Sequence, residues 1–438
     1  MKAFKVYMPY EAELALKILS DNGYDGYIVG GCVRDSILGV EPEDWDITTS
    51  ALPSQITECF KDYKMIETGL KHGTVAVIIN NVMLEITTYR IDGKYTDNRR
   101  PDFVEFTNKI ELDLERRDFT INAMAYNEAI GLVDCFCGID DINLKKIKCV
   151  GNPDIRFSED GLRILRALRF ASVLDFQIED ETSKSIHKNR EMLKNISAER
   201  LAAEFNKLIK GVNFMNIMTE YRDVISVFIP ELKNMSIYEN GRDLYHHSLI
   251  AMANVRNDLV LKLVLLFHET GRFADPYEIK KGDGYSKTSL EIASNALNRL
   301  KYDKSTIKSV KNLIMHHDEK IEANAISIKR WLNKIGEESL KNLIEIKKAD
   351  LKSSDFVHED MLREIFNAEL ILNDILKNNH CYSLKNLAVK GDDLIAAGIQ
   401  ESSEIGRILN ELLEVVIDEK IENNRDKLLN YAEKNINF

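Results

Sequence analysis

The spacing of hydrophobic residues changes near residue 140, and this change separates two kinds of predicted structure. Before it, short runs rich in Val, Ile and Thr alternate with polar turns, which is typical of strands. After it, apolar residues recur at helical spacing, and only 7 prolines in the whole chain interrupt helices. The pattern predicts an α+β protein with a small mixed-sheet head followed by all-helical neck, body and tail domains, at residues 1–140, 141–212, 213–340 and 341–438.

Individual elements of the head can be predicted from the same pattern. An amphipathic helix is expected over residues 10–20, a short buried strand over 26–29 and another strand around 44–48. The β-rich runs 74–79 and 82–89 are separated by two asparagines. Because Asn tolerates positive φ, this spacing predicts a β-hairpin.

Composition is typical of a globular protein. Of the 438 residues, 44% are hydrophobic and 30% are charged. No apolar run is long enough to span a bilayer, and the N-terminus lacks the apolar core of a signal peptide. The cysteine spacing fits no zinc motif, so we expect free thiols in a reducing cytoplasm. The six cysteines are Cys32, Cys59, Cys135, Cys137, Cys149 and Cys381.

The net charge of −12 argues against a surface that is basic throughout, which phosphate backbones would attract. The charge is unevenly distributed, with about −10 in residues 1–140, about +3 in residues 141–212 and about −5 in residues 213–438. An RNA-binding surface should therefore be a local patch, and charge alone does not indicate RNA.

The first candidate for chemistry is the acidic pair Asp44 and Asp46, which follows the glycine pair Gly30-Gly31. Residues two apart on a strand share a face, so the two carboxylates would repel each other unless a cation such as Mg²⁺ lay between them. Glycines after a strand let backbone N–H groups approach a polyphosphate. Each feature alone is usually a surface pair or a turn, but together they indicate a nucleotidyl-transfer site.

Four segments follow one another in the first half of the chain: Gly30–Asp46, Glu115–Ala123, Glu159–Phe170 and Ser197–Arg200. In this order they resemble the signatures of the class II tRNA nucleotidyltransferase/poly(A) polymerase family, whose best-known members are the CCA-adding enzymes. Gly161 departs from the family pattern, which often has proline at this position. The second half of the chain resembles the family much more weakly.

The resemblance implies roles for individual residues. Asp44 and Asp46 would hold two catalytic Mg²⁺ ions, one activating the RNA 3′-hydroxyl and the other holding the triphosphate. A third carboxylate commonly comes from a neighbouring strand, and Glu85 is the candidate, although it is equally expected to face solvent at a sheet edge. Asp118 would select ribose through its 2′-hydroxyl. The nucleotide-binding set is Gly31, Arg34, Arg117, Asp118, Asp160, Arg163, Arg166 and Arg169.

The segment 158–171 is predicted to be one helix, capped by Ser158. A well-capped surface helix with a Glu159–Arg163 pair explains part of this sequence. By resemblance, Asp160 and Arg163 read the base edge. Cytosine and adenine both offer an amino donor beside a ring-nitrogen acceptor, whereas uracil and guanine offer the reverse, so a hydrogen-bonding site rejects them.

The segment from Tyr89 to Asp102 is polar and rich in turn-forming residues, which is ordinary for a surface loop. In the CCA-adding enzymes that the chain resembles, this position holds a loop that helps the switch from C to A addition. Its presence argues mildly against an enzyme that adds only C.

Histidines in the body resemble the ligand pattern of HD-type metal phosphohydrolases. They occur in His246-His247, His268-Glu269 and His316-His317-Asp318, with His268-Glu269 at the place of the central His-Asp pair. No other histidine lies between Glu269 and His316, so we expect an incomplete ligand set, and a metal site needs its full set. A degenerate remnant without hydrolase activity is therefore predicted.

The sequence thus predicts a cytoplasmic, Mg²⁺-dependent enzyme that adds C, C and A to the 3′ end of tRNA from CTP and ATP, with release of pyrophosphate. Its expected partners are tRNA and the two nucleotides, with no membrane, and the oligomeric state is left open. An A-only adder, a CC-only adder and a bacterial poly(A) polymerase share these signatures and stay open. A phosphohydrolase and an inactive RNA-binding protein are the alternatives from other classes.

Overall fold

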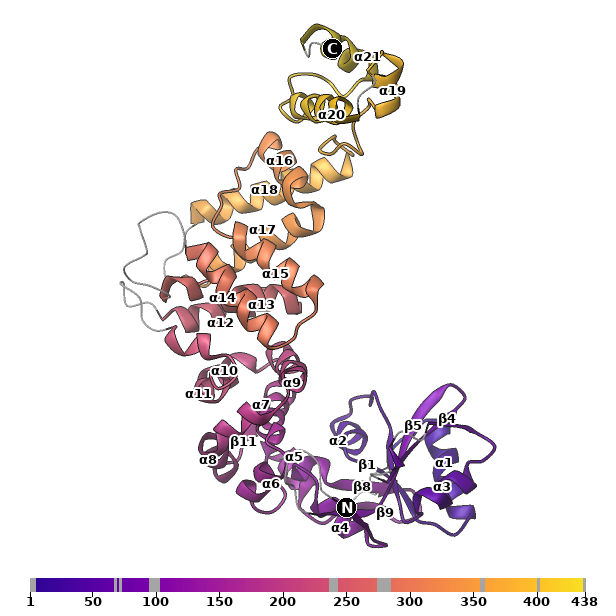
Figure 1. Ribbon diagram of the computed structural model, residues 1–438. Helices are drawn as coiled ribbons and strands as arrows, with labels where there is room; N and C mark the ends of the chain where they lie inside the picture. The colour runs from indigo at the N-terminus through magenta and orange to yellow at the C-terminus, as the bar shows by residue number, and fades with distance from the viewer. Residues whose placement is uncertain are drawn as a thin grey trace. The chain divides into compact units, whose positions relative to one another are not determined.

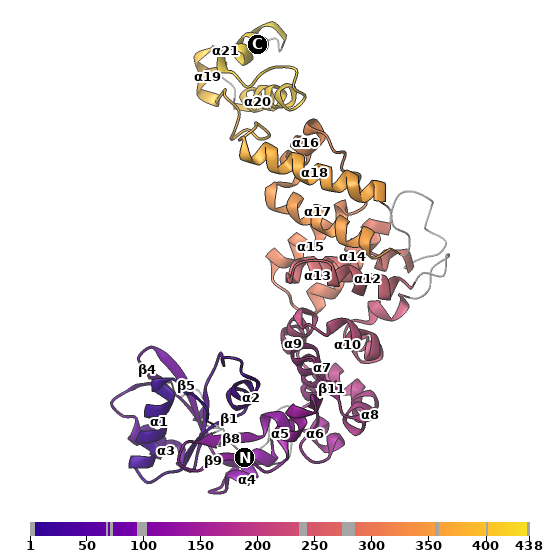
Figure 2. The same cartoon turned by 180° about the vertical axis from the view of Figure 1, so that it is seen from behind.

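The computed structural model describes residues 5–66, 69–70, 73–93, 103–235, 243–273, 285–354, 359–399 and 402–435. The chain forms two compact units, Met1–Pro230 and Glu231–Phe438. In Figures 1 and 2 the first unit combines strands with helices, and the described part of the second unit is helical. The α+β class predicted from the sequence is therefore confirmed, whereas the division into four domains stays a prediction.

The first unit is built on a seven-stranded mixed sheet with the order β3-β4-β5-β2-β1-β8-β9. Its strands are β1 (Gly26–Val29), β2 (Asp46–Thr49), β3 (Lys64–Ile66), β4 (Thr74–Ile79), β5 (Val82–Thr88), β8 (Met124–Asn127) and β9 (Gly131–Asp134). Only β2 and β5 pair in parallel among the described strands of this sheet, and β2 lies between β1 and β5. Ile28, Ile47 and Ile86 are buried on these three strands and form part of the core.

Several local predictions are confirmed. Helix α1 spans Tyr10–Asp21, and β1 has the predicted limits. The hairpin of β4 and β5 turns at Asn80 and Asn81, which have φ values of 48° and 68°. Positive φ at both central residues matches the twist of the flanking strands.

Strand β2 begins at Asp46, so the expectation that Asp44 and Asp46 lie on one strand is wrong. Asp44 belongs to the segment before β2. The β1–β2 pairing runs from Gly26 opposite Thr49 only to Ile28 opposite Ile47. Beyond Val29 the chain turns into helix α2, so β1 offers no partner to the residues before Asp46.

Helices cover the sheet and form the rest of the first unit. They are α2 (Gly31–Leu38), α3 (Pro53–Cys59), α4 (Ile110–Glu115), α5 (Gly138–Asn143), α6 (Pro153–Glu159), α7 (Leu162–Leu174), α8 (Asp180–Asn189), α9 (Ala198–Lys210), α10 (Phe214–Glu220) and α11 (Arg222–Ile225). Two short ribbons pair β6 (Arg90–Asp92) with β7 (Val104–Phe106) and β10 (Lys146–Ile147) with β11 (Gln177–Ile178). The predicted loop 89–102 therefore starts with a strand, and residues 94–102 lie outside the described residues.

The segment 158–171 forms parts of two helices and not the single helix predicted. Helix α6 ends before Asp160, whose backbone is extended at φ −139°, and α7 begins at Leu162. Ser158 lies inside α6, where its hydroxyl donates to the carbonyl oxygen of Ile155 (2.7 Å), so it does not cap a helix. The break arises because the Asp160 carboxylate accepts a hydrogen bond from the Leu162 N–H (3.0 Å), which competes with continuing the helix.

The helices of the second unit are α12 (Leu244–Ala253), α13 (Leu259–Phe267), α14 (Tyr285–Arg299), α15 (Lys304–His316), α16 (Ala325–Ile335), α17 (Glu337–Lys352), α18 (Glu359–Lys377), α19 (Gly391–Ala396), α20 (Ser402–Ile417) and α21 (Arg425–Asn435). Every residue of α13 from Leu261 to Phe267 is buried, and α12, α15 and α17 pack around it. Apart from Lys262 the helix is apolar on all sides, which is typical of a helix at the centre of its domain. Among the described residues, none of the helices is long and apolar enough to cross a membrane.

Candidate active site

Two further carboxylates, those of Asp44 and Glu85, lie near Asp46 where β2 begins. In the parallel register of β2 and β5, Asp46 lies opposite Glu85, and residues that pair in this way project from the same face of a sheet. Asp44, Asp46 and Glu85 are all exposed. The pKa of Asp46 is raised, because neighbouring groups partly desolvate its carboxylate and because the charges of Glu85 and Asp44 repel it. The positive charge of Arg117 opposes this rise. The structure thus places the predicted third carboxylate beside the acidic pair.

The glycine pair forms the turn from β1 into α2. Gly30 has φ +83°, a left-handed conformation that favours glycine, and a Cβ added here would lie 3.0 Å from a guanidinium nitrogen of Arg117. Gly31 is the first residue of α2. The turn therefore allows Arg117 to lie directly against the backbone, next to the N-terminus of the helix.

Arg34 connects the first two signatures. Its side chain lies on α2 and donates to the Asn122 side-chain oxygen (2.6 Å) and to Asp35 (2.8 Å). Arg34 thus combines an ion pair with its neighbour Asp35 and a contact to the second signature. Asn122 lies within that signature but is not among the predicted site residues.

A buried carboxylate that the sequence did not single out, Asp113, holds the second signature against the sheet. It accepts two hydrogen bonds from Arg116 (3.0 and 2.8 Å) and one from Arg117 (3.4 Å). It also accepts one from the hydroxyl of Thr48 (3.2 Å). Because Thr48 and Asp46 lie on the same strand, these contacts fix the arginines near the acidic pair.

Asp118 is the acceptor that joins the second signature to α7. It accepts hydrogen bonds from Arg166 (2.8 and 2.5 Å), from the Asn122 side chain (3.2 Å) and from the backbone N–H of Phe119 (2.8 Å). Burial raises the pKa of Asp118, but the charges of Arg166 and Arg163 and the hydrogen bonds outweigh it and lower this pKa to about 2.

Asp160 and Arg163 reach in different directions. Asp160 accepts a hydrogen bond from Arg200 of α9 (2.7 Å). Arg163 donates to the carbonyl oxygen of Arg116 (2.9 Å) and pairs with Glu159, as the sequence predicted for an i,i+4 pair. The two residues are thereby oriented by partners from different segments of the chain.

Three guanidinium groups surround the ring of Phe170. Arg169 lies 3.9 Å from the ring centroid, Arg34 5.1 Å and Arg166 5.3 Å. Glu204 of α9 forms an ion pair with Arg169 (3.0 Å). Burial lowers the pKa of Arg169 to about 10, although Glu204 raises it. Asp35 and Asp118 pair with the other two arginines, so the ring and three carboxylates hold the three guanidinium groups in place.

The four signatures are joined by direct side-chain contacts within one compact unit. The connecting pairs are Arg34–Asn122, Asp118–Arg166 and Asp160–Arg200. Arg200 and Glu204 were not among the predicted site residues, and only the position of Arg200 in the fourth signature pointed to it.

Replacing Asp118 with asparagine should lower the free energy of unfolding by about 2–3 kcal/mol near neutral pH, since Arg166 loses its anionic partner. Because the pKa of Asp118 is lowered on folding, its contribution is present above an unfolded pKa of about 3.9. That contribution is lost as the pH falls towards about 2. The difference between wild type and variant should therefore shrink below about pH 4, as measured by urea unfolding across pH.

The matched control for this measurement is Asp62→Asn, which changes an exposed carboxylate of the same unit and should have little effect. A stability difference that stays constant down to acidic pH would show that Asp118 acts through packing and not through its charge.

The structure adds one carboxylate to the histidine pattern of the body, for which the sequence predicts an incomplete ligand set. His247, His268 and Glu269 converge with Asp350, and one potential ligand atom from each lies within 4.8 Å of the others. The sequence reasoning missed Asp350 because it lies 82 residues beyond His268, with no local pattern that marks it. Across the described ranges, no other group of three or more such side chains is this tightly clustered.

Comparison with protein families matches three segments of the chain. The family described as "Poly A polymerase head domain" matches residues 26–148. "Probable RNA and SrmB- binding site of polymerase A" matches 175–235, and "tRNA nucleotidyltransferase domain 2 putative" matches 285–432. Residues 236–284 lie between the matched segments.

Two curated relatives are similar over nearly their whole length. A CCA-adding enzyme of Limosilactobacillus reuteri is 34% identical over 429 residues, covering 97% of this chain and 96% of the relative. A CCA-adding enzyme of Lacticaseibacillus paracasei is 32% identical over 418 residues, covering 95% of this chain and 94% of the relative. The crystal structure of the Bacillus stearothermophilus CCA-adding enzyme in complex with CTP has a TM-score of 0.73 and 26% identity, covering 98% of each chain.

Proposed function

This chain belongs to the CCA-adding enzymes of the class II tRNA nucleotidyltransferase/poly(A) polymerase family, and we propose that its four joined signatures form the active site. It adds C, C and A to the 3′ end of tRNA from CTP and ATP, with release of pyrophosphate. The observation that supports the proposed site is the set of contacts that joins all four signatures within the first compact unit.

Nucleotidyl transfer in this family uses a divalent metal ion, and the residues present fit Mg²⁺. The donors Asp44, Asp46 and Glu85 are all carboxylates, the oxygen ligands that this hard cation prefers. When bound, the metal supplies a Lewis acid that activates the 3′-hydroxyl and neutralises charge on the departing pyrophosphate. The chain itself contributes the β2–β5 register, which sets Glu85 beside Asp46.

The triphosphate is bound by positive and backbone donors next to these acids. Gly31 begins α2, and Arg117 lies against the turn that precedes it. Arg34 and Arg169 extend this positive surface around Phe170. These guanidinium groups are already held in position, so binding of the phosphates requires no free energy to reorient them, and an anion is favoured here.

Base selection is assigned to Asp160 and Arg163. The carboxylate of Asp160 accepts from Arg200 and from the Leu162 N–H, yet each carboxylate oxygen has a further lone pair that can accept from a base amino group. Arg163 is held by the carbonyl oxygen of Arg116. Asp118 is held by Arg166 and is assigned to the ribose 2′-hydroxyl, because its carboxylate can accept a further hydrogen bond from that hydroxyl.

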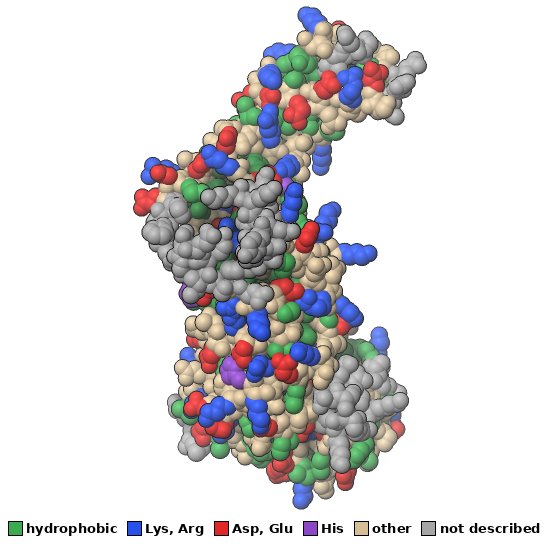
Figure 3. Space-filling view, turned by 60° about the vertical axis from the view of Figure 1, so that its left-hand side comes forward, with side chains coloured by type: hydrophobic (Ala, Val, Ile, Leu, Met, Phe, Trp, Pro, Cys, Tyr) green, Lys and Arg blue, Asp and Glu red, His purple; other side chains and the backbone are tan. Residues whose placement is uncertain are grey.

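Contact with tRNA is expected to use local patches of positive charge. Figure 3 shows Lys and Arg side chains interspersed with Asp and Glu over the visible face. The locally basic neck, residues 141–212 with a charge of about +3, stays the predicted site of such a patch. All six cysteines are free thiols, which agrees with the proposed location in a reducing cytoplasm.

One assay separates this function from its relatives. Purified protein is given tRNAs that end at the discriminator base, after the first C or after the second C, with each labelled nucleotide in turn. We expect CMP on the first two acceptors and a single AMP on the third. AMP on the third acceptor alone would indicate an A-only adder, CMP without AMP a CC-only adder, and repeated AMP a poly(A) polymerase.

A further inference from the structure

Asn122 connects two parts of the candidate active site that are assigned to different parts of a nucleotide. It ends the short 3₁₀ turn Thr120–Asn122 of the second signature, just before β8. Its side chain is buried, and its backbone carbonyl oxygen lies 3.8 Å from the position that a Cβ would take at Gly30. The residue is therefore held against the turn that leads into α2, where the triphosphate is proposed to bind.

The two ends of the Asn122 amide have different partners. The side-chain oxygen accepts a hydrogen bond from Arg34 (2.6 Å), and the side-chain nitrogen donates to Oδ1 of Asp118 (3.2 Å). A guanidinium group only donates, and the Asp118 carboxyl is an ionised acceptor because its pKa is lowered to about 2. These partners fix which way the amide points, and both of its ends are satisfied.

The position requires an amide. Among side chains of this size, only asparagine offers an acceptor on one branch and a donor on the other. Aspartate has the same shape, but it would turn a second acceptor toward the acceptor Asp118. Alanine would reach neither Arg34 nor Asp118.

The other contacts of Asp118 constrain its carboxylate in different ways. Arg166 of α7 donates twice to Oδ2 (2.8 and 2.5 Å), whereas the N–H of Phe119 donates to Oδ1 (2.8 Å). Phe119 is the next residue in the chain, so its N–H moves together with Asp118. The Asn122 amide instead connects Oδ1 to Arg34, and thereby to α2.

We propose that Asn122 is a positioning residue for ribose selection, which sets the distance between Asp118 and Arg34. The inference rests on the function proposed above, in which Asp118 recognises the 2′-hydroxyl and Arg34 binds the triphosphate. Covalent bonds join the ribose to the triphosphate, so a nucleotide bound at Arg34 presents its 2′-hydroxyl at a limited range of distances. Discrimination against deoxynucleotides therefore depends on Asn122, although this residue acts through Asp118 and not on the nucleotide itself.

The test compares CTP with dCTP in single-nucleotide incorporation into a tRNA ending at the discriminator base, at a temperature at which every variant is folded. Asn122→Asp keeps the acceptor for Arg34 and removes the donor to Asp118. It should lower the ratio of kcat/KM for CTP to that for dCTP by about 10-fold or more, because small displacements of a positioned group have large effects. Its KM for CTP should rise less than that of Asn122→Ala, which loses both contacts. A folded variant of either kind that keeps the wild-type ratio would overturn the proposal.

Asn127→Asp is the matched control, because it makes the same substitution in the same compact unit but outside the proposed active site. The Asn127 amide also uses both ends, since it donates to the carbonyl oxygen of Gly26 (2.6 Å) and accepts from the N–H of Ala129 (2.8 Å). This variant should melt at a lower temperature and keep the wild-type ratio of CTP to dCTP use. An equal loss of discrimination in Asn127→Asp would show that general loosening of the unit changes the ratio, which would also overturn the proposal.

Asp118→Ala separates this inference from the function on which it rests. We expect it to lose discrimination between CTP and dCTP at least as far as the Asn122 variants do. If Asp118→Ala keeps the wild-type ratio, the assignment of Asp118 to the 2′-hydroxyl is wrong and the inference fails with it. If Asp118→Ala loses the ratio and the Asn122 variants keep it, only the role of Asn122 is wrong.

Discussion

Asp46→Ala is expected to lower the rate of nucleotide incorporation at least about 10³-fold, since it removes a ligand of the catalytic metal and with it several kcal/mol of transition-state stabilisation. Asp44→Ala should have an effect of similar size. Single-nucleotide incorporation into a tRNA ending at the discriminator base, with CTP and saturating Mg²⁺, measures both.

The same variants should keep their melting temperature in metal-free buffer. Asp46 is exposed and stands beside Glu85 and Asp44, so its removal relieves repulsion and leaves no cavity. Glu43→Gln is the matched control, because Glu43 is an exposed acid next to Asp44. Near-normal turnover of Asp46→Ala, or an equal loss in Glu43→Gln, would remove the metal assignment.

Asp160→Ala is expected to reduce discrimination between CTP and UTP by about 10²-fold or more, because the acceptor for the base amino group is lost. Asp160→Asn should go further and favour UTP, since its amide can donate to the uracil carbonyl. Relative kcat/KM values for CTP and UTP on a tRNA that accepts C measure the change.

The structure gives Asp160 a second role, which the control must separate. Its carboxylate binds the Leu162 N–H and pairs with Arg200, so alanine should also cost about 0.5–2 kcal/mol of stability as a lost helix cap. Arg200→Gln removes the ion pair but keeps the carboxylate, and it should lower the melting temperature with little loss of base discrimination. If Asp160→Ala melts earlier but still rejects UTP, Asp160 is a structural residue.

The sequence by itself determined the features that depend on neighbouring residues. Asn80 and Asn81 specify the β4–β5 turn through their own φ values, and α1 follows from apolar spacing along its own length. The four signatures are also short segments whose residues are close in sequence. They were enough to indicate the family and its reaction. Local chemistry suffices for such features because the chain within each segment is nearly fixed.

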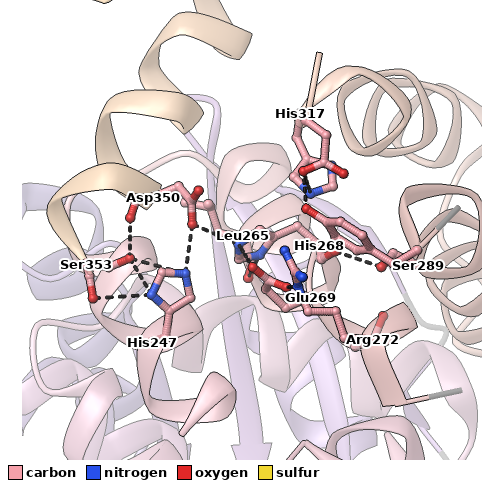
Figure 4. A network of polar contacts seen from close by, with 12 residues as sticks. His247, Leu265, His268, Glu269, Arg272, Ser289, His317, Asp350 and Ser353 are labelled. Carbon is pink, nitrogen blue, oxygen red and sulfur yellow. Dashed lines mark hydrogen bonds and ion pairs between the residues drawn. The ribbon is translucent and has the colours of Figure 1, made fainter. Parts of the chain in front are cut away.

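Features that depend on distant segments were decided only by the tertiary structure. The pairing of Asp46 with Glu85 follows from the strand order, and the contact of Asp160 with Arg200 follows from the packing of α9 against α7. Asp350 joins the histidine cluster from 103 residues beyond His247 (Figure 4). Periodicity carries no information on which distant segments meet, because packing of the whole core decides it.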